Sequence, residues 1–345
     1  MTMADLTIMG AGVFGLSLAL VCAQRGARVR VIEKRSIGAG SSGGLVGALA
    51  PHVPENWNAK KAFQFEALRM AAEFWREVAR LSSVDPGYAR LGRVQPVEER
   101  GLDLAHARSA GAADLWDGFA SWQVLRATDA PGLAVHSPSG WVIHDTLSAR
   151  LHPRGACNAL AGAVRALGGE IIFGTGIEQG PVIWATGHEG LADLTQDLGR
   201  PVGTGVKGQS LLLRHASPDA PQIFADGLHI VPHADGTVAI GSTSERVFSD
   251  ASSVDSQCDL LLAHACAACP ALRSAPLIEA WAGARPRAQS RAPLLGAWPG
   301  RAGHFVFNGG FKIGFAMAPA LARLMADLVL EGRDTVPASF SFGAL

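Results

Sequence analysis

The sequence lacks an excess of charge of either sign. Lysine and arginine total 30, aspartate and glutamate also total 30, and the formal net charge at pH 7 is zero. A polyanion such as nucleic acid is attracted by excess positive charge, which this chain does not have. The composition therefore disfavours bulk nucleic-acid binding.

Long apolar runs are also missing. No stretch reaches the roughly 18 uninterrupted apolar residues that a membrane helix requires, and the most apolar region, residues 10–23, is broken by glycines and polar residues. The first five residues lead directly into an apolar strand pattern, without the basic start, apolar core and cleavage site of a secretory signal. We expect a soluble, cytoplasmic protein with no membrane partner.

Cysteine is scarce and irregularly spaced. Five cysteines form an odd set, which in a cytoplasmic chain indicates reduced, mostly buried thiols. Cys266 and Cys269 form a lone CxxC, and a coincidence within a helix is favoured over a redox pair or half of a zinc site. His229 and His233 flank one strand, and metal binding would need a third ligand that the sequence does not offer. We expect no metal.

Apolar residues, by contrast, are plentiful. The chain is 48% hydrophobic and only 17% charged, which indicates a folded globular protein with a sizeable core. At 345 residues it exceeds the usual size of a single core, so two domains are expected.

A glycine motif near the start predicts a nucleotide site. Gly10, Gly12 and Gly15 form GxGxxG between an apolar strand and a helical stretch, and a second strand ends at Glu33. The first glycine allows the tight turn, the second lets backbone approach a pyrophosphate, and the third lets the helix pack on the strand. The acidic side chain can accept hydrogen bonds from a ribose hydroxyl pair, which we favour over a solvated strand end.

One segment favours an FAD site over an NAD site. It is Ser41-Ser42-Gly43-Gly44-Leu45-Val46-Gly47-Ala48-Leu49-Ala50-Pro51-His52. Its small side chains and hydroxyls are clustered where a long flat cofactor must lie against backbone. A nicotinamide dehydrogenase has no need of such a segment.

Patterns along the rest of the chain predict the remaining elements. Helices are expected at 60–81, 102–113, 153–167, 254–269 and 315–331, buried strands at 170–173 and 181–187, alternating strands over 203–247, and a strand at 305–308. No internal repeat is visible.

Four separated motifs resemble the FAD-dependent D-amino-acid oxidase family, within it the glycine oxidase and sarcosine oxidase branches. They are GAGVFG with Glu33, SSGGLVGALAPH, the pair HIVPHADGTVAIGST and AGARP, and NGGFKIGFAMAP, in family order along the whole chain. The resemblance implies an α/β fold, with a Rossmann-like FAD-binding domain of the GR2 type and an inserted α+β substrate domain on a twisted mixed or antiparallel sheet. The FAD-binding domain is expected at 1–85, 141–202 and 281–345, and the substrate domain at 86–140 and 203–280.

The resemblance also implies two cationic groups beside the substrate. Arg285 matches the arginine that pairs with the substrate carboxylate in glycine oxidases, and a guanidinium fork suits that task. Lys312 matches a second cationic position, and the helix after it would direct its positive end at the flavin. A surface salt bridge is the alternative for both side chains. His52 could orient the amine or accept a proton, and capping of the turn after Pro51 is an equal alternative.

The motifs assign FAD contacts to a set of small, glycine-rich positions and a few polar ones. They are Gly10, Gly12, Val13, Phe14, Gly15, Glu33, Lys34, Ser41, Ser42, Gly47, Ala48, Leu49, Gly176, Ile177, Ala185, Thr186, Gly187, Gly309, Gly310, Phe311, Lys312 and Ile313.

Several positions depart from the family pattern. The only tyrosine, Tyr88, lies outside the motifs, and Ala239 stands where sarcosine oxidases carry an oxygen-activating lysine. Residues 287–295 contain no cysteine that could attach the flavin, so FAD is expected to be noncovalent. The hairpin usual between residues 173 and 182 is nearly absent, and Gly176 and Ile177 are expected to cover the adenine instead.

The sequence thus predicts an FAD-dependent oxidoreductase that oxidises the C–N bond of a small amino acid or amine by hydride transfer to flavin N5. Oxygen or another electron acceptor would reoxidise it. Two alternatives stay open. One is an enzyme like the flavin domain that acts on a modified tRNA uridine side chain, which the neutral charge disfavours. The other is a non-catalytic FAD-binding protein.

Overall fold

The computed structural model describes residues 3–345, and its first layer is a six-stranded sheet. The strand order is β15-β16-β9-β1-β2-β8, and every neighbouring pair is parallel except β15 with β16. The strands are β1 Leu6–Met9, β2 Val29–Glu33, β8 Glu170–Phe173, β9 Val182–Trp184, β15 Leu294–Ala297 and β16 His304–Asn308. β2 is buried along its whole length, as a strand covered on both faces must be.

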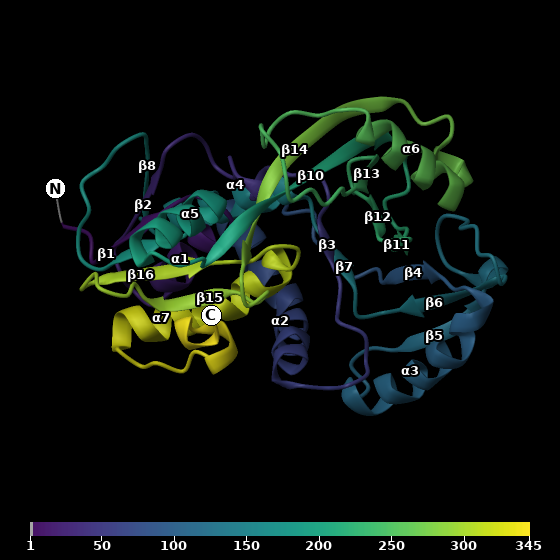
Figure 1. Cartoon of the computed structure of the whole chain (residues 1–345), viewed down its shortest axis with the longest axis horizontal. Coiled ribbons are helices and arrows are strands. Elements are labelled where there is room, and N and C mark those ends of the chain that lie inside the picture. The colour runs from purple at the N-terminus through teal and green to yellow at the C-terminus, as the bar shows by residue number, and fades with distance from the viewer. Residues whose placement is uncertain (1–2) are drawn as a thin grey trace.

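Four helices pack together beside this sheet and form the largest core (Figure 1). They are α1 Val13–Gln24, α2 Ala59–Ser82, α4 Pro153–Ala166 and α7 Gly314–Glu331. Ten of the twelve residues of α1 are buried, because α4 and α7 pack on it. A helix that is apolar on all sides requires such cover. The helix α5 Gly187–Leu198 instead contacts two strands of the second sheet.

The second layer is an eight-stranded mixed sheet of order β14-β10-β13-β12-β11-β4-β6-β5. Only β11 and β4 pair in parallel. Its strands are β4 Arg93–Pro96, β5 Trp122–Arg126, β6 Trp141–Asp145, β10 Gly203–Arg214, β11 Gln222–Ala225, β12 Leu228–Pro232, β13 Thr237–Gly241 and β14 Leu277–Ala288. The helices α3 Leu102–Leu115 and α6 Gln257–Ala268 pack on it, and a small sheet of β3 Ala48–Leu49 and β7 Ala149–Arg150 lies between the two halves.

Side chains alternate across the central strands of the eight-stranded sheet. One face carries Leu211, Leu213, Ile230 and Ile240, which are buried in a core shared with α6. The next residues along each strand point to the opposite face, because the side-chain period of a strand is two. That opposite face turns toward the six-stranded half and is available to line a site.

The predicted fold class is confirmed: a Rossmann-like half is combined with a sheet-based second half. Most predicted helices and strands are present within a few residues of their expected limits. The helix α5 and the strands β14 and β15 are not among the predicted elements. The domain limits stay a prediction, and β14 runs across the limit set at residue 281.

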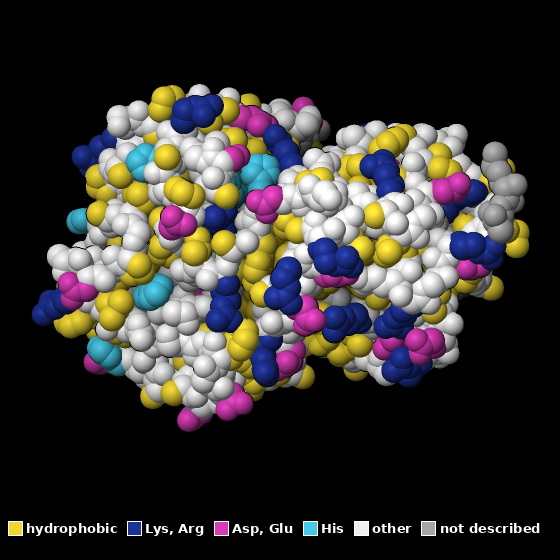
Figure 2. Space-filling model, turned by 180° about the vertical axis from the view of Figure 1, so that it is seen from behind, with side chains coloured by type: hydrophobic (Ala, Val, Ile, Leu, Met, Phe, Trp, Pro, Cys, Tyr) yellow, Lys and Arg dark blue, Asp and Glu magenta, His cyan; other side chains and the backbone are white. Residues whose placement is uncertain are grey.

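The surface carries mixed charge. On the face shown in Figure 2, basic and acidic side chains are interspersed rather than gathered into one stripe. Among the described residues, no helix is both long enough and apolar enough to cross a membrane.

We predict that Gly15→Ala destabilises the fold. A Cβ at this position would lie 2.0 Å from the carbonyl oxygen of Gly10, so the strand and helix would have to separate, at a cost of about 1 to 3 kcal/mol. The urea midpoint of the FAD-depleted protein should fall.

Gly314→Ala provides the control in a second helix. Its nearest new contact is Val13 Cγ1 at 3.8 Å, an ordinary distance, and alanine favours helix over glycine. Its midpoint should therefore not fall. A Gly15→Ala protein as stable as the parent would show that the turn can open freely.

Candidate functional site

A cavity of about 460 Å³ lies between the two sheets. Residues at the carboxyl ends of four parallel strands border it: Met9 of β1, Glu33 of β2, Trp184 of β9 and Asn308 of β16. Open α/β sheets bind ligands at this edge, because the connections after the strands separate there. The face of the eight-stranded sheet that turns away from α6 closes the cavity on its other side.

The glycine turn forms a cradle at the start of α1. Gly10 has a φ of +106°, and a Cβ there would lie 2.6 Å from the carbonyl oxygen of Ala185. A Cβ at Gly12 would lie 3.2 Å from Ser42 Oγ, which accepts a hydrogen bond from the N–H of Val13 at 3.0 Å. No acidic residue occupies the first turn of α1, so its positive end is available to an anionic group.

Glu33 is a buried carboxylate, only 9% exposed, at the end of β2. Its two oxygens accept hydrogen bonds from the backbone N–H groups of Ala11, at 2.8 Å, and Arg35, at 2.9 Å. These bonds hold the carboxylate against the glycine turn. Each carboxylate oxygen can accept a further bond, so the side chain can hold a ribose hydroxyl pair at the cavity wall.

The structure brings most of the predicted positions to this cavity. Those that line it are Gly10, Gly12, Val13, Phe14, Glu33, Lys34, Ser41, Ser42, Ala48, Ala185, Thr186, Gly187, Arg285, Gly310, Phe311 and Lys312. Five more do not line the cavity but lie next in sequence to residues that do: Gly15, Gly47, Leu49, Gly309 and Ile313. A Cβ on Gly47 would lie 1.8 Å from the carbonyl oxygen of Leu151. The individual roles of these residues toward FAD stay predictions.

The remaining three predicted positions also lie outside the lining. His52 bonds to the side chain of Gln64 through both its backbone N–H and its Nδ1, which matches the local alternative rather than a substrate contact. Ile177 is 77% exposed, and its carbonyl accepts a bond from Arg30. Gly176 packs against Ile32, which does line the cavity. Neither Gly176 nor Ile177 therefore contacts the cavity, where the adenine was expected to be covered by them.

A row of side chains across the eight-stranded sheet was not predicted. Phe224, His229, Gly241, Ser210 and Trp281 come from five successive strands, are direct cross-strand partners, and all line the cavity. Single strands show which residues alternate, but only the pairing register aligns them into one row. No local sequence signal could have identified this set.

Arg285 is held firmly but has no carboxylate partner. Its Nη1 donates to Ser242 Oγ, and its Nη2 donates to the carbonyl oxygens of Thr243, at 2.6 Å, and Lys207, at 3.3 Å. Nε is buried without a partner, and among residues 3–345 the guanidinium makes no salt bridge. Burial lowers the pKa of Arg285 to about 10, which still leaves it cationic at neutral pH.

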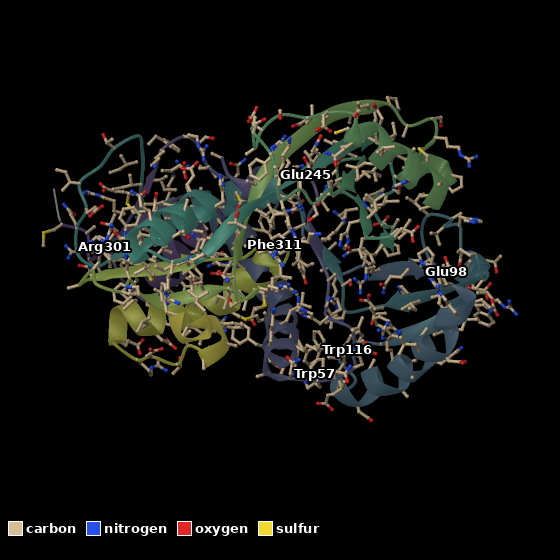
Figure 3. All side chains as sticks on the ribbon, viewed as in Figure 1. Trp57, Glu98, Trp116, Glu245, Arg301 and Phe311 are labelled. Atoms are coloured by element: carbon tan, nitrogen blue, oxygen red, sulfur yellow. The ribbon has the colours of Figure 1, made fainter. Side chains whose placement is uncertain are left out.

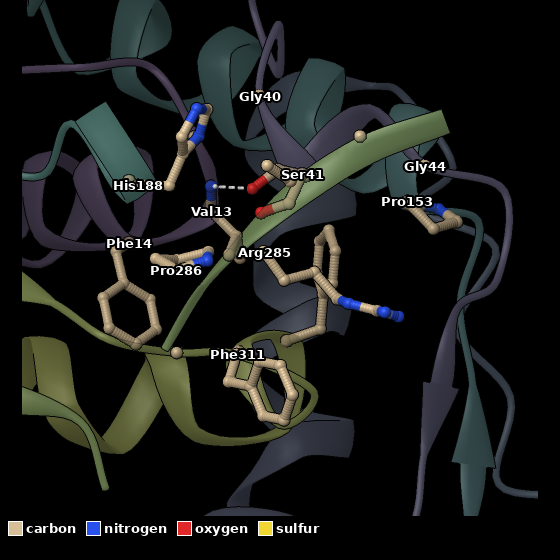
Figure 4. A pocket seen from close by; sticks show the side chains of 18 of the residues that line it. Val13, Phe14, Gly40, Ser41, Gly44, Pro153, His188, Arg285, Pro286 and Phe311 are labelled. Atoms are coloured by element: carbon tan, nitrogen blue, oxygen red, sulfur yellow. Dashed lines mark hydrogen bonds between the residues drawn. The ribbon is translucent and has the colours of Figure 1, made fainter. Parts of the chain in front are cut away.

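Lys312 supplies a second cation close to the first. It follows β16, and its Nζ lies 5.8 Å from the ring centre of Phe311, while the Arg285 guanidinium lies 5.7 Å from the same ring. Burial lowers the pKa of Lys312, and the charge of Arg285 lowers it further. In Figure 4, Arg285 extends past Phe311 and away from Phe14 and His188, and Figure 3 places Phe311 where the two halves meet.

These features fit a flavin dinucleotide. The cavity joins a glycine cradle and a ribose-binding carboxylate at one strand edge to a cationic region under the second sheet. Thr186 Oγ1 is buried without a hydrogen-bond partner in the described chain. A bound ligand could supply the missing partner. No cluster of three or more metal-binding side chains occurs within residues 3–345.

Comparison with known proteins identifies the family. A model described as FAD dependent oxidoreductase matches residues 5–328. A bifunctional protein ThiO/ThiG of Trichormus variabilis is 27% identical over 96% of this chain and 53% of its own length. The chain thus spans about half the length of that relative. A glycine oxidase of Geobacillus kaustophilus is 26% identical, over 96% of this chain and 94% of its own.

Solved structures agree with the fold. The crystal structure of glycine oxidase from Geobacillus kaustophilus has a TM-score of 0.85 at 23% identity and covers 99% of this chain and 98% of its own. Iminodiacetate oxidase from Chelativorans sp. has a TM-score of 0.83, also at 23% identity, and covers 97% of this chain and 98% of its own.

We predict that Glu33→Ala weakens FAD binding. The change removes hydrogen bonds to a charged acceptor, worth roughly 1.5 to 3 kcal/mol, so the Kd for FAD should rise about ten- to hundredfold. Titration of FAD-depleted protein with FAD, followed by flavin fluorescence, measures the change.

Glu170→Ala is the matched control, because it removes a carboxylate on the neighbouring strand β8 that does not line the cavity. Its Kd should match that of the parent. An equal effect of both substitutions would place the ribose elsewhere.

Proposed function

Because this chain belongs to the FAD dependent oxidoreductase family, we propose that it oxidises the C–N bond of a small amino acid, with its carboxylate held by Arg285. The cofactor is FAD, and the cradle, the buried Glu33 and the sheet face fit it. Noncovalent attachment and the roles of the single residues belong to this proposal.

The observation that carries the proposal is the unpaired guanidinium of Arg285. The nearby carboxylate of Glu245 favours the charged form of Arg285, but its oxygens contact Lys207, Gln209 and Thr243 and form no salt bridge with the guanidinium. A partly buried cation without a direct ion pair is stabilised when a ligand supplies a negative charge. Hydrogen bonds to Ser242, Lys207 and Thr243 fix one side of the group, while its Nε and one Nη1 hydrogen have no partner within the described chain. A small carboxylate satisfies both the charge and the remaining donors.

The other cavity residues restrict where the substrate lies. Bound FAD would supply the acceptor, at flavin N5, for the hydride of the substrate carbon. Arg285 binds the carboxylate, Lys312 adds a second positive charge, and the ring of Phe311 lies beside both cations. Trp281 and Phe224 form apolar walls on the sheet face, which exclude water from the reacting region.

Glycine is the favoured substrate among small amino acids. Relatives named glycine oxidase match this chain at 26 and 22% identity over 96 and 94% of its length, and two others at 33 and 31% over 38% of it. A putative thiamine biosynthesis oxidoreductase of Rhizobium etli is 29% identical over 94% of this chain. Oxygen or another acceptor would take the electrons from the reduced cofactor. Ala239 is fully buried in β13 and offers no cationic group to activate oxygen.

We predict that Arg285→Ala lowers kcat/KM at least thirtyfold with the best amino-acid substrate. The change leaves the substrate carboxylate without its charged partner in the cavity, at a cost of roughly 2 to 5 kcal/mol. FAD content should hardly change. Arg285→Lys should restore little, because an ammonium group cannot reproduce the bidentate geometry. Anaerobic flavin bleaching and steady-state kinetics provide the measurements.

Arg287→Ala is the control for this experiment. Arg287 lies on the same strand, and its guanidinium is also near the Phe311 ring, at 5.6 Å, but it does not line the cavity. It should retain near-parental kinetics. If Arg285→Ala loses FAD or oxidises carboxylate substrates as well as the parent does, Arg285 is structural.

We also predict that acid precipitation releases all of the FAD. None of the five cysteines, four of them buried, lines the cavity, so no thiol is placed to attach the flavin. The supernatant should carry the yellow chromophore and the pellet none. Flavin retained in the pellet would contradict noncovalent binding.

A further inference from the structure

The row across the eight-stranded sheet contains one histidine, and its surroundings determine which ring nitrogen carries the proton. His229 lies on β12, beside Phe224 on β11 and Gly241 on β13. Its Nδ1 lies 3.2 Å from Gln222 Oε1, and its ring centre lies 4.6 Å from that of Phe224. The ring is therefore fixed on two sides.

Gln222 has only one possible orientation. The residue is 1% exposed, and its Nε2 donates to the carbonyl oxygen of Ala149 at 2.9 Å. Reversal of the amide would set two oxygens against each other, so Oε1 must face the histidine as an acceptor. His229 Nδ1 must then carry a hydrogen and donate it.

The imidazole is neutral at physiological pH. Burial, together with the positive charges of Arg93 and Lys312, lowers the pKa of His229 to about 3. Arg93 lies on β4 and pairs with Asp145, whereas Lys312 follows β16. A neutral ring with hydrogen on Nδ1 has a lone pair on Nε2. The one hydrogen bond of the ring within residues 3–345 is made by Nδ1, which leaves Nε2 without a partner there, and His229 lines the cavity.

We propose that His229 Nε2 accepts a hydrogen bond from the substrate amine and so orients the substrate. This inference rests on the proposed function, because it needs a ligand with a carboxylate at Arg285. The Nε2 lone pair repels a carboxylate oxygen and attracts an N–H group. The carboxylate of an amino acid therefore binds Arg285, and its amine binds His229. The acidic side chains of the cavity, Glu33, Glu189 and Asp193, lie on β2 and α5. None of them belongs to this sheet.

The geometry gives His229 a positioning role rather than that of a base. A neutral ring that is hard to protonate holds an N–H group without taking its proton. Binding of an amino acid should accordingly show no inflection near pH 6 to 7 that arises from this histidine.

The test uses two ligands of nearly the same shape. 2-Aminoisobutyrate has no hydrogen on its α-carbon, so it cannot lose a hydride there, and pivalate replaces its amino group with a methyl group. Both are titrated into the FAD-loaded protein, and the change in the flavin absorption spectrum gives each Kd. The parent should prefer 2-aminoisobutyrate. In His229→Phe that preference should fall about tenfold or more, while the Kd for pivalate stays unchanged.

Two further variants separate the hydrogen bond from packing. His229→Gln retains an acceptor oxygen and should recover part of the preference, whereas Phe224→Leu alters the packing and should move both Kd values in parallel. ¹⁵N chemical shifts of labelled histidine should show hydrogen on Nδ1 of the His229 ring at pH 7. Should His229→Phe fail to fold, this last measurement still tests the proposal.

The outcomes distinguish this inference from the proposed function. If both ligands bind and His229→Phe leaves their ratio unchanged, or if Nε2 carries the hydrogen, the role of His229 is overturned while carboxylate recognition stands. If the parent binds neither ligand, carboxylate recognition fails and the inference fails with it.

Discussion

The pairing of β10 with β14 is the constraint on which the site depends. The two strands pair from Gly203 with Ala288 to Leu213 with Leu277, and both also contact α5 of the six-stranded half. The pair therefore spans both halves of the molecule (Figure 1). Arg285 and Trp281 lie on one of these strands and Ser210 on the other, so their positions over the cavity follow from this register. A shift of one residue would turn each of them to the face packed on α6.

Charge in the cavity is distributed unequally. The six-stranded side carries the acidic Glu33 and the positive end of α1, while Arg285 and Lys312 lie near the second sheet. Arg285 and Lys312 repel each other and form no salt bridge within residues 3–345, although the charge of Glu245 partly offsets that of Arg285. The carboxylate of the proposed substrate would offset these charges further. The electrostatics and the shape of the cavity consequently favour the same kind of ligand, an anionic group beside a flat apolar cofactor.

The position of His229 shows how one strand pairing determines chemistry. Its ring is set against Gln222 and Phe224 by the β11–β12 pairing, and burial with two nearby cations keeps it neutral. An isolated histidine near neutrality could donate or accept at either nitrogen. Here the amide of Gln222, fixed in turn by Ala149, removes that ambiguity.

The sequence by itself determined the local motifs and the class of fold. GxGxxG with Glu33 and the glycine-rich segment 41–52 act through backbone geometry and residues close in sequence. Their role in binding a dinucleotide could therefore be predicted without knowledge of tertiary contacts. Arg285 and Lys312 were identified by the motifs around them. The row of Phe224, His229, Gly241, Ser210 and Trp281 was decided only by the tertiary structure, because these residues are distant in sequence and meet through strand register. Tertiary packing also explains why His52 does not line the cavity. His52 belongs to the glycine-rich segment in sequence, but it forms hydrogen bonds with Gln64 of α2.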